Sequence, residues 1–163
     1  MYVYTYNINT YIYIMKLEDE IKQTKFKSEH QKLTINIMYT SNWLIAHHSK
    51  HLKQYGLTPE QFNLLRILRG QHPKPATVNL IIERMLNKMS NASRLVEKLR
   101  KKGLVERSTS EEDRRACDVM ITKKGLSILS ELDKDEKELN KMIHGISYSE
   151  AKKINVLLDK MRK

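Results

Sequence analysis

The alternation of apolar and polar residues predicts a largely helical chain. Between positions 18 and 55 there is no glycine or proline, and Met38, Ile45 and Leu52 recur every seven residues. Apolar residues at this spacing line one face of a helix. We therefore expect one long helix with a break near Phe26, and we expect it to end at Gly56.

A capping box opens the next helix. Thr58 can accept a hydrogen bond from the first turn, Pro59 suits the first helical position, and Gln61 completes the box. Apolar residues at helical spacing then predict a short helix over 77–85 and, after a brief break, a longer helix over 88–102.

The pattern next changes to short alternating segments. Residues 104–107 and 117–121 are typical of two strands, and the polar residues 108–115 between them are typical of a hairpin tip. Helices followed by a strand–loop–strand unit with a basic tip make a winged helix-turn-helix. The predicted fold class is therefore mainly α with a small β-hairpin wing.

Two more helices are expected after the hairpin. Thr122 caps the first, which runs to about His144, and Ser147 with Glu150 forms a capping box for the second. The apolar stripe of the last helix consists of Ala151, Ile154, Leu158 and Met161. Together with the long N-terminal helix, these helices present more apolar surface than one small lobe can cover, so we expect a homodimer.

Residues 1–14 differ from the rest of the chain. They are uncharged, contain five tyrosines and alternate like a strand, yet no partner strand is evident nearby. Either Met15 is the natural start and this segment is a poorly ordered or artefactual extension, or the segment is an arm that packs on a partner subunit.

Composition narrows the class of partner. The 163 residues favour one compact domain, and a net charge of +11 suits a polyanion, either nucleic acid or an anionic membrane surface. Cys117 is the only cysteine, and no apolar run is long enough to span a membrane. The N-terminus lacks the pattern of a signal peptide. We expect a cytoplasmic protein without an intrachain disulfide and without a membrane partner.

Basic residues are concentrated around the helix expected over 88–102. Eight basic and two acidic residues lie between Arg84 and Arg107. Arginine can bind guanine with two hydrogen bonds, asparagine can do so with adenine, and lysine neutralises phosphates. The candidate DNA-binding residues here are Lys88, Ser90, Asn91, Ser93, Arg94, Lys98 and Arg107. The alternative is a solvated basic face on an ordinary helix. The basic hairpin that follows favours DNA binding over this alternative.

The hairpin tip supplies a second candidate contact with double-stranded DNA. Arg114 and Arg115 could enter a narrow minor groove, and Asp113 could orient one of them through a salt bridge. A surface hairpin with mixed charges is the alternative, although isolated surface charge pairs contribute little stability.

Three segments resemble the multiple-antibiotic-resistance regulator (MarR) family. They are MSNASRLVEKLRKKGLVER (89–107), DRRACDVMITKKG (113–125) and YGLTPEQFNLLRIL (55–68). The first two, in this order and spacing, are the specific signal, and the resemblance covers about residues 30–163. The turn at residues 86–88 departs from the small residues that are more common there.

The resemblance implies a homodimeric transcriptional regulator that binds a pseudo-palindromic operator. It implies a DNA-binding lobe at 57–122 and dimerisation helices at 30–56 and 123–163, after an N-terminal extension and helix start at 1–29. It also implies that Ser90, Asn91, Ser93 and Arg94 lie in the recognition helix and that Asp113 and Arg115 belong to the wing motif.

Regulators of this family usually respond to a small anionic or phenolic ligand, to oxidation or to a metal. Cys117 lies on a predicted wing strand and not on the first helix, where the family's peroxide sensors carry their thiol, so we do not expect redox sensing. Tyr39, Trp43 and His47 could instead line a ligand pocket between the dimerisation and DNA-binding lobes.

Three histidines, His47, His48 and His51, lie on one expected helix. His47 and His51 are one turn apart and could share a zinc ion, but no further ligand is evident from the sequence. The alternative is ordinary histidines near a dimer interface or a pocket, and we predict no metal site.

Enzyme signatures are missing from the sequence, which has no Gly-rich phosphate loop, nucleophile elbow or HExxH motif. We therefore expect neither catalysis nor a cofactor. The expected function is a repressor that a small molecule releases from its operator. The alternative is a constitutive or architectural DNA-binding protein without a ligand. The sequence identifies neither the ligand nor the operator, and it leaves repression and activation both open.

Overall fold

The structure of the chain is a computed structural model. It describes residues 16–109, 117–134, 143 and 145–162. The expectations for residues 1–14 and for Asp113, Arg114 and Arg115 at the hairpin tip therefore lie outside the described residues. So does most of the segment between Lys134 and the expected helix end at His144.

The chain divides into two compact units, residues 1–44 and 45–163. The first unit contains α1 (Leu17–Ile21) and most of α2 (Glu29–Lys53). α1 ends at Lys22, which adopts the left-handed conformation with a φ of 55°. The predicted break in the long N-terminal helix is confirmed, because residues 22–28 separate α1 from α2.

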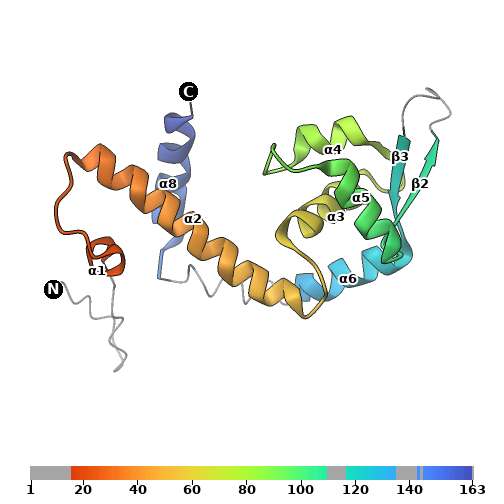
Figure 1. Cartoon of the computed structure of the whole chain (residues 1–163), viewed down its shortest axis with the longest axis horizontal. Coiled ribbons are helices and arrows are strands. Elements are labelled where there is room, and N and C mark those ends of the chain that lie inside the picture. The colour runs from red at the N-terminus through yellow and green to blue at the C-terminus, as the bar shows by residue number, and fades with distance from the viewer. Residues whose placement is uncertain (1–15, 110–116, 135–142, 144, 163) are drawn as a thin grey trace. The chain divides into compact units, whose positions relative to one another are not determined.

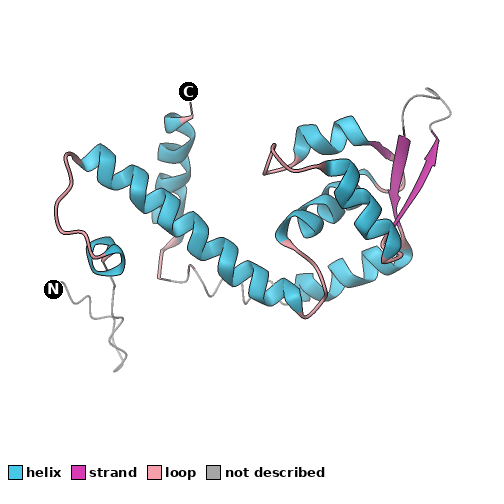
Figure 2. Cartoon of the chain, viewed as in Figure 1, coloured by secondary structure: helices cyan, strands magenta, loops and turns pink. Residues whose placement is uncertain are grey.

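The second unit contains the helices that follow α2 and a small sheet (Figures 1 and 2). Its helices before the hairpin are α3 (Pro59–Gln71), α4 (Val78–Arg84) and α5 (Ala92–Lys101), and after it come α6 (Lys123–Lys134) and α8 (Tyr148–Met161). The helix predicted over 77–85 is confirmed as α4, with Thr77 as its N-cap accepting from Leu80 N at 3.2 Å.

The sheet has three antiparallel strands in the order β1-β3-β2. They are β1 (Ala76–Thr77), β2 (Val105–Thr109) and β3 (Cys117–Ile121). The hairpin pairs Val105 with Ile121 and Thr109 with Cys117, so the predicted wing is confirmed. β1 was not predicted, because two residues are too few to show an alternation. The predicted fold class, mainly α with a small β-hairpin, is confirmed.

One apolar core holds the second unit together. Leu52 at the end of α2, Leu64 and Leu65 of α3, Leu99 of α5 and Val119 of β3 are fully buried in it. Complete burial of a leucine contributes roughly 1.5–3 kcal/mol relative to an exposed one. The helices predicted from their apolar spacing therefore keep their apolar faces in a shared interior.

The predicted capping box at the start of α3 is present. Thr58 Oγ1 accepts from Gln61 N, and Gln61 Oε1 accepts from Thr58 N, both at 3.3 Å. Gln61 is a buried polar side chain, and it is satisfied because Lys102 Nζ also donates to its Oε1 at 3.0 Å. The box therefore ties the start of α3 to the end of α5.

A corner between the hairpin and α6 depends on Thr122. Its hydroxyl donates to Gly103 O at 2.8 Å and accepts from Gly125 N at 3.1 Å, so Thr122 caps α6 as predicted. Gly125 is buried here, and a Cβ built on it would lie 2.5 Å from Leu104 O and 2.7 Å from Ile121 Cγ1. Only a residue without a side chain fits this close approach.

The last helix, α8, begins at the predicted capping box of Ser147 and Glu150. None of its residues is buried within the single chain. Across the described ranges of the chain, no helix is long and apolar enough to cross a membrane.

We expect Gly125→Ala to destabilise the fold by about 1–3 kcal/mol, because the added methyl meets a backbone carbonyl that cannot turn aside. Urea unfolding followed by circular dichroism measures the free energy of unfolding. Gly70→Ala is the matched control, since a Cβ at Gly70 meets nothing within 4 Å. Equal stability of the two variants would contradict the corner described above.

Candidate nucleic-acid interface

The turn between α4 and α5 holds the residues expected to approach DNA. The prediction that the second helix begins at Lys88 is wrong, because α5 begins at Ala92. Asn87 accounts for the difference: its Oδ1 accepts from Met89 N at 3.0 Å, and its backbone oxygen accepts from Ser90 N at 3.2 Å. An asparagine that bonds the local backbone in this way competes with helix formation.

Asn91 is the N-cap of α5. Its Oδ1 accepts a hydrogen bond from Arg94 N at 2.9 Å. A two-bond contact with adenine would use the same oxygen as an acceptor together with the amide nitrogen as a donor. Because a carbonyl oxygen has two lone pairs, the cap and a base contact can coexist. Asn91 therefore sets the start of the helix and presents its amide at the exposed end.

The rest of α5 has two distinct faces. Ala92, Val96 and Leu99 are buried, whereas Arg94 and Lys98 are exposed. Ser93 is exposed as well. A helix anchored by one face and polar on the other is what entry into a major groove requires.

An ion pair within α5 joins Glu97 to Arg100. Glu97 accepts two hydrogen bonds from Arg100, at 2.9 and 3.0 Å. The hydrogen bond from Arg100 lowers the pKa of the Glu97 carboxyl. Within the described residues, neither Arg94 nor Lys98 forms an ion pair with an acidic side chain. The only carboxylate of α5 is thus satisfied by Arg100, and the positive charge of Arg94 and Lys98 remains directed to solvent.

Lys88 has a structural contact that the sequence did not predict. Its ammonium donates to the carbonyl oxygen of Glu83 and, at 3.5 Å, to that of Ile82, at the C-terminal end of α4. A cation suits this negative end of a helix dipole. Lys88 is nevertheless exposed, and its contact with phosphate stays a prediction.

The wing is described up to Thr109 and again from Cys117. Arg107 on β2 is exposed, and its Nη2 donates to Cys117 Sγ on β3 at 2.8 Å. Asp113, Arg114 and Arg115 lie outside the described residues, so their contacts with DNA stay a prediction.

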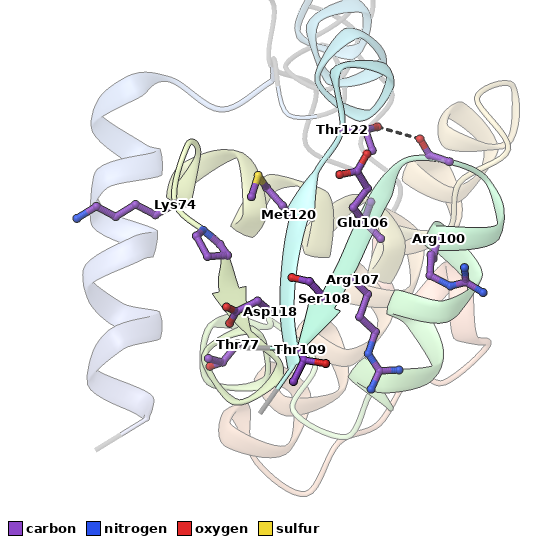
Figure 3. Close-up of a pocket in the computed structure, with 13 residues that line it drawn as sticks. Lys74, Thr77, Arg100, Glu106, Arg107, Ser108, Thr109, Asp118, Met120 and Thr122 are labelled. Carbon is purple, nitrogen blue, oxygen red and sulfur yellow. Dashed lines mark hydrogen bonds between the residues drawn. The ribbon is translucent and has the colours of Figure 1, made fainter. Parts of the chain in front are cut away.

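A depression lined by polar and apolar residues lies beside the sheet (Figure 3). Residues from the loop before β1, from the C-terminal end of α5 and from β2 and β3 line it, among them Lys74, Arg107 and Asp118. The sequence did not predict this depression. Its lining mixes acidic and basic side chains, and none of the three residues predicted for a ligand pocket contributes to it.

Those three residues are placed on α2. Tyr39 donates a hydrogen bond to a Glu20 carboxylate oxygen, and this bond raises the pKa of the Tyr39 phenol. Trp43 is 37% exposed, and His47 is exposed. A ligand pocket formed by Tyr39, Trp43 and His47 stays a prediction.

The histidines of α2 pack individually. His48 meets the Phe62 ring of α3 edge to face, with 5.2 Å between ring centroids. Burial lowers the pKa of His48, and the neighbouring His51 and Arg66 lower it further. Among the described residues, no group of three or more His, Cys, Asp or Glu side chains is placed to hold a metal ion.

Comparisons with known proteins agree with this geometry. A sequence profile described as the MarR family matches residues 55–116, which begin just after α2 and include α3, α4, α5 and β2. The HTH-type transcriptional regulator MhqR of Bacillus subtilis (strain 168) is 29% identical over 116 residues, which are 71% of this chain and 79% of MhqR. Residues 55–116 of the chain thus match the MarR family, and the chain is similar to MhqR over most of its length. The matched relative is a transcriptional regulator.

Solved structures show the same fold. MepR of S. aureus, crystallised in complex with DNA, has a TM-score of 0.71 and 20% identity, over 84% of this chain and 97% of that one. BpsR of Bordetella bronchiseptica, whose regulation of DNA binding by 6-hydroxynicotinic acid was studied structurally, also has a TM-score of 0.71 and 20% identity, over 81% and 99%. The chain therefore has the winged-helix fold of these structures.

Two substitutions test the capping role of Asn91. Asn91→Ala should lower the free energy of unfolding by about 0.5–2 kcal/mol, because Arg94 N loses its acceptor. Asn91→Ser retains a capping oxygen and should unfold like the parent, although it lacks the amide. Urea unfolding of the parent and both variants tests the cap, and an Asn91→Ala variant as stable as the parent would rule it out.

Proposed function

We propose that this chain acts as a homodimeric, sequence-specific repressor that binds a pseudo-palindromic operator in double-stranded DNA. The exposed polar face of α5 carries the proposal. Asn91 at the N-cap, Arg94 in the first turn and Lys98 in the last turn of α5 are exposed, whereas the opposite face of this helix is buried. Repression follows if the bound dimer covers a promoter.

The side chains of this surface divide into readers and positioning contacts. Arg94, in the first turn of α5, is suited to a guanine edge, and Ser90, Asn91 and Ser93 are suited to neighbouring bases. Lys88, Lys98 and Arg107 are suited to phosphates, which fix the register without reading sequence. Arg114 and Arg115 would extend the contact into the minor groove, with Asp113 orienting one of them.

The dimer is supported by apolar residues that one chain leaves exposed. On α8, Ile154 is 42% exposed and Leu157 is 60% exposed, and on α2 Met38 is 62% exposed. Helices rarely keep several large apolar side chains in water unless another surface covers them. A second copy of the chain would cover these residues and relate two recognition helices by a two-fold axis.

Release by a small anionic or phenolic molecule is the finer part of the proposal. Its support is the regulation of BpsR by 6-hydroxynicotinic acid and the phenol and imidazole side chains of Tyr39 and His47 on α2. The alternative, a constitutive or architectural DNA-binding protein, would keep its operator affinity whichever small molecule is added. A screen of phenols and aromatic acids against the operator complex distinguishes the two.

We expect Ile154→Glu combined with Leu157→Glu to convert a dimer into a monomer or an insoluble product, because the interface would have to bury two carboxylates. Size-exclusion chromatography with light scattering at micromolar concentration measures the oligomeric state. Asn155→Glu is the matched control, since it adds a carboxylate at an exposed polar position of the same helix. A soluble monomer formed by the parent chain would refute the dimer.

The central prediction concerns Arg94. On a duplex selected by the full-length protein from a random library, Arg94→Ala should weaken binding by about 1–3 kcal/mol and relax the preference at one base pair per half-site. Lys98→Ala, Arg114→Ala and Arg115→Ala should weaken binding to selected and scrambled duplexes alike. Fluorescence anisotropy at two salt concentrations measures these affinities, which should fall steeply with salt.

The selected duplex itself is part of that test. Its half-sites should be centred roughly one helical turn, about 10 bp, apart. Arg162→Ala, at an exposed arginine that follows α8, serves as the matched control. Parental affinity in the Arg94, Arg114 and Arg115 variants would show that α5 and the wing do not bind the DNA.

A further inference from the structure

Two large apolar side chains stand exposed in the turn that precedes α5. Leu86 is 89% exposed and Met89 is 93% exposed, more than the other large apolar residues in the described part of the chain. The neighbouring Met85, by contrast, is buried, with 2% of its surface exposed. The apolar spacing that predicts the helices gives these two residues no partner, and the function proposed so far gives them no role.

Hydrogen bonds fix the backbone of Leu86 and Met89. Leu86 N donates to Asn63 Oδ1 of α3 at 2.9 Å, which anchors the turn to the core. Met89 N donates to Asn87 Oδ1 at 3.0 Å. Their exposure is thus a consequence of a hydrogen-bonded turn, and binding a partner here needs no reordering of the backbone.

The surroundings indicate what that partner is. Lys88 lies in the turn, Arg84 precedes it and Arg94 follows it, and all three are exposed. A basic surface with two apolar side chains suits a partner that carries negative charge around small apolar groups. The major groove of DNA has this chemistry, because phosphates flank it and each thymine presents a C5 methyl group in it.

We propose that Leu86 and Met89 contact thymine methyl groups and so add a preference for A·T base pairs beside those that α5 reads. This inference rests on the proposed DNA-binding function. The turn lies directly before the N-cap Asn91, so its side chains would meet bases adjacent to those read from the first turn of α5. Methionine adapts its shape to such a contact because its side chain is unbranched and flexible.

Uracil provides a direct test, because replacing dT by dU removes the methyl group and leaves the base pairing unchanged. The full-length protein first selects its operator from a random duplex library. Each thymine of a half-site is then replaced by uracil, singly and at both symmetric positions, and affinity is measured by anisotropy. We expect one or two positions at which each lost methyl weakens binding about fourfold.

Substitutions then assign each sensitive position. Met89→Ala and Leu86→Ala should each bind the thymine operator more weakly and lose the uracil effect at its own position. Binding to a scrambled duplex should not change. Met120→Ala is the matched control, because Met120 is 39% exposed on β3, away from the turn, and this variant should keep the full uracil effect.

The outcomes distinguish this inference from the function on which it rests. Specific operator binding that tolerates uracil everywhere, or a uracil effect unchanged in both alanine variants, overturns the thymine contact and leaves the repressor proposal standing. A selection that enriches no sequence overturns both.

Discussion

Burial of one face of α5 is the constraint on which the rest of the lobe depends. Val96 and Leu99 insert into a core shared with α3 and the hairpin. Each fully buried leucine of this kind contributes a few kcal/mol, which is a large part of the net stability of a small domain. With that face held, the opposite face has a fixed orientation, and the positions of Arg94 and Lys98 follow from it.

Asparagine side chains control the approach to that helix. Asn63 on α3 holds Leu86 N, Asn87 closes the turn, and Asn91 caps α5. Each side-chain oxygen accepts a hydrogen bond from a backbone N–H that is not bonded within a helix. The asparagine bonds hold the backbone of this turn, so its conformation does not depend on the contacts of the other side chains. The turn can therefore expose polar and apolar side chains together.

Ion pairs within the lobe determine which basic side chains remain unpaired with carboxylates. Arg100 pairs with Glu97 on α5, and Arg69 pairs with Asp133 at 2.5 Å between α3 and α6. Exposed pairs of this kind add little stability, so their main effect here is on the local potential. Cations near the start of α5 are left to attract phosphates, an attraction that weakens as salt rises.

Much of this protein could be predicted from local signals. Capping boxes at Thr58 and Ser147 and apolar residues at helical spacing depend on neighbours within one turn, so they are visible in the sequence. The hairpin strands were visible for the same reason. The exposed residues of α5, including Arg94 and Lys98, followed from the placement of its apolar positions. The resemblance to the MarR family led to the function proposed above.

Tertiary structure decided what depends on distant partners. The start of α5 moved from Lys88 to Ala92 because Asn87 and Asn91 bond the backbone, and Lys88 turned back to the end of α4. β1 exists because β3 offers it an edge, and Gly125 must be a glycine because Leu104 and Ile121 approach it. The sequence by itself determined which faces are apolar, since that depends on residue type and spacing. Only the folded chain decided which exposed side chains lack an internal partner, because contacts between distant segments leave no periodic signal.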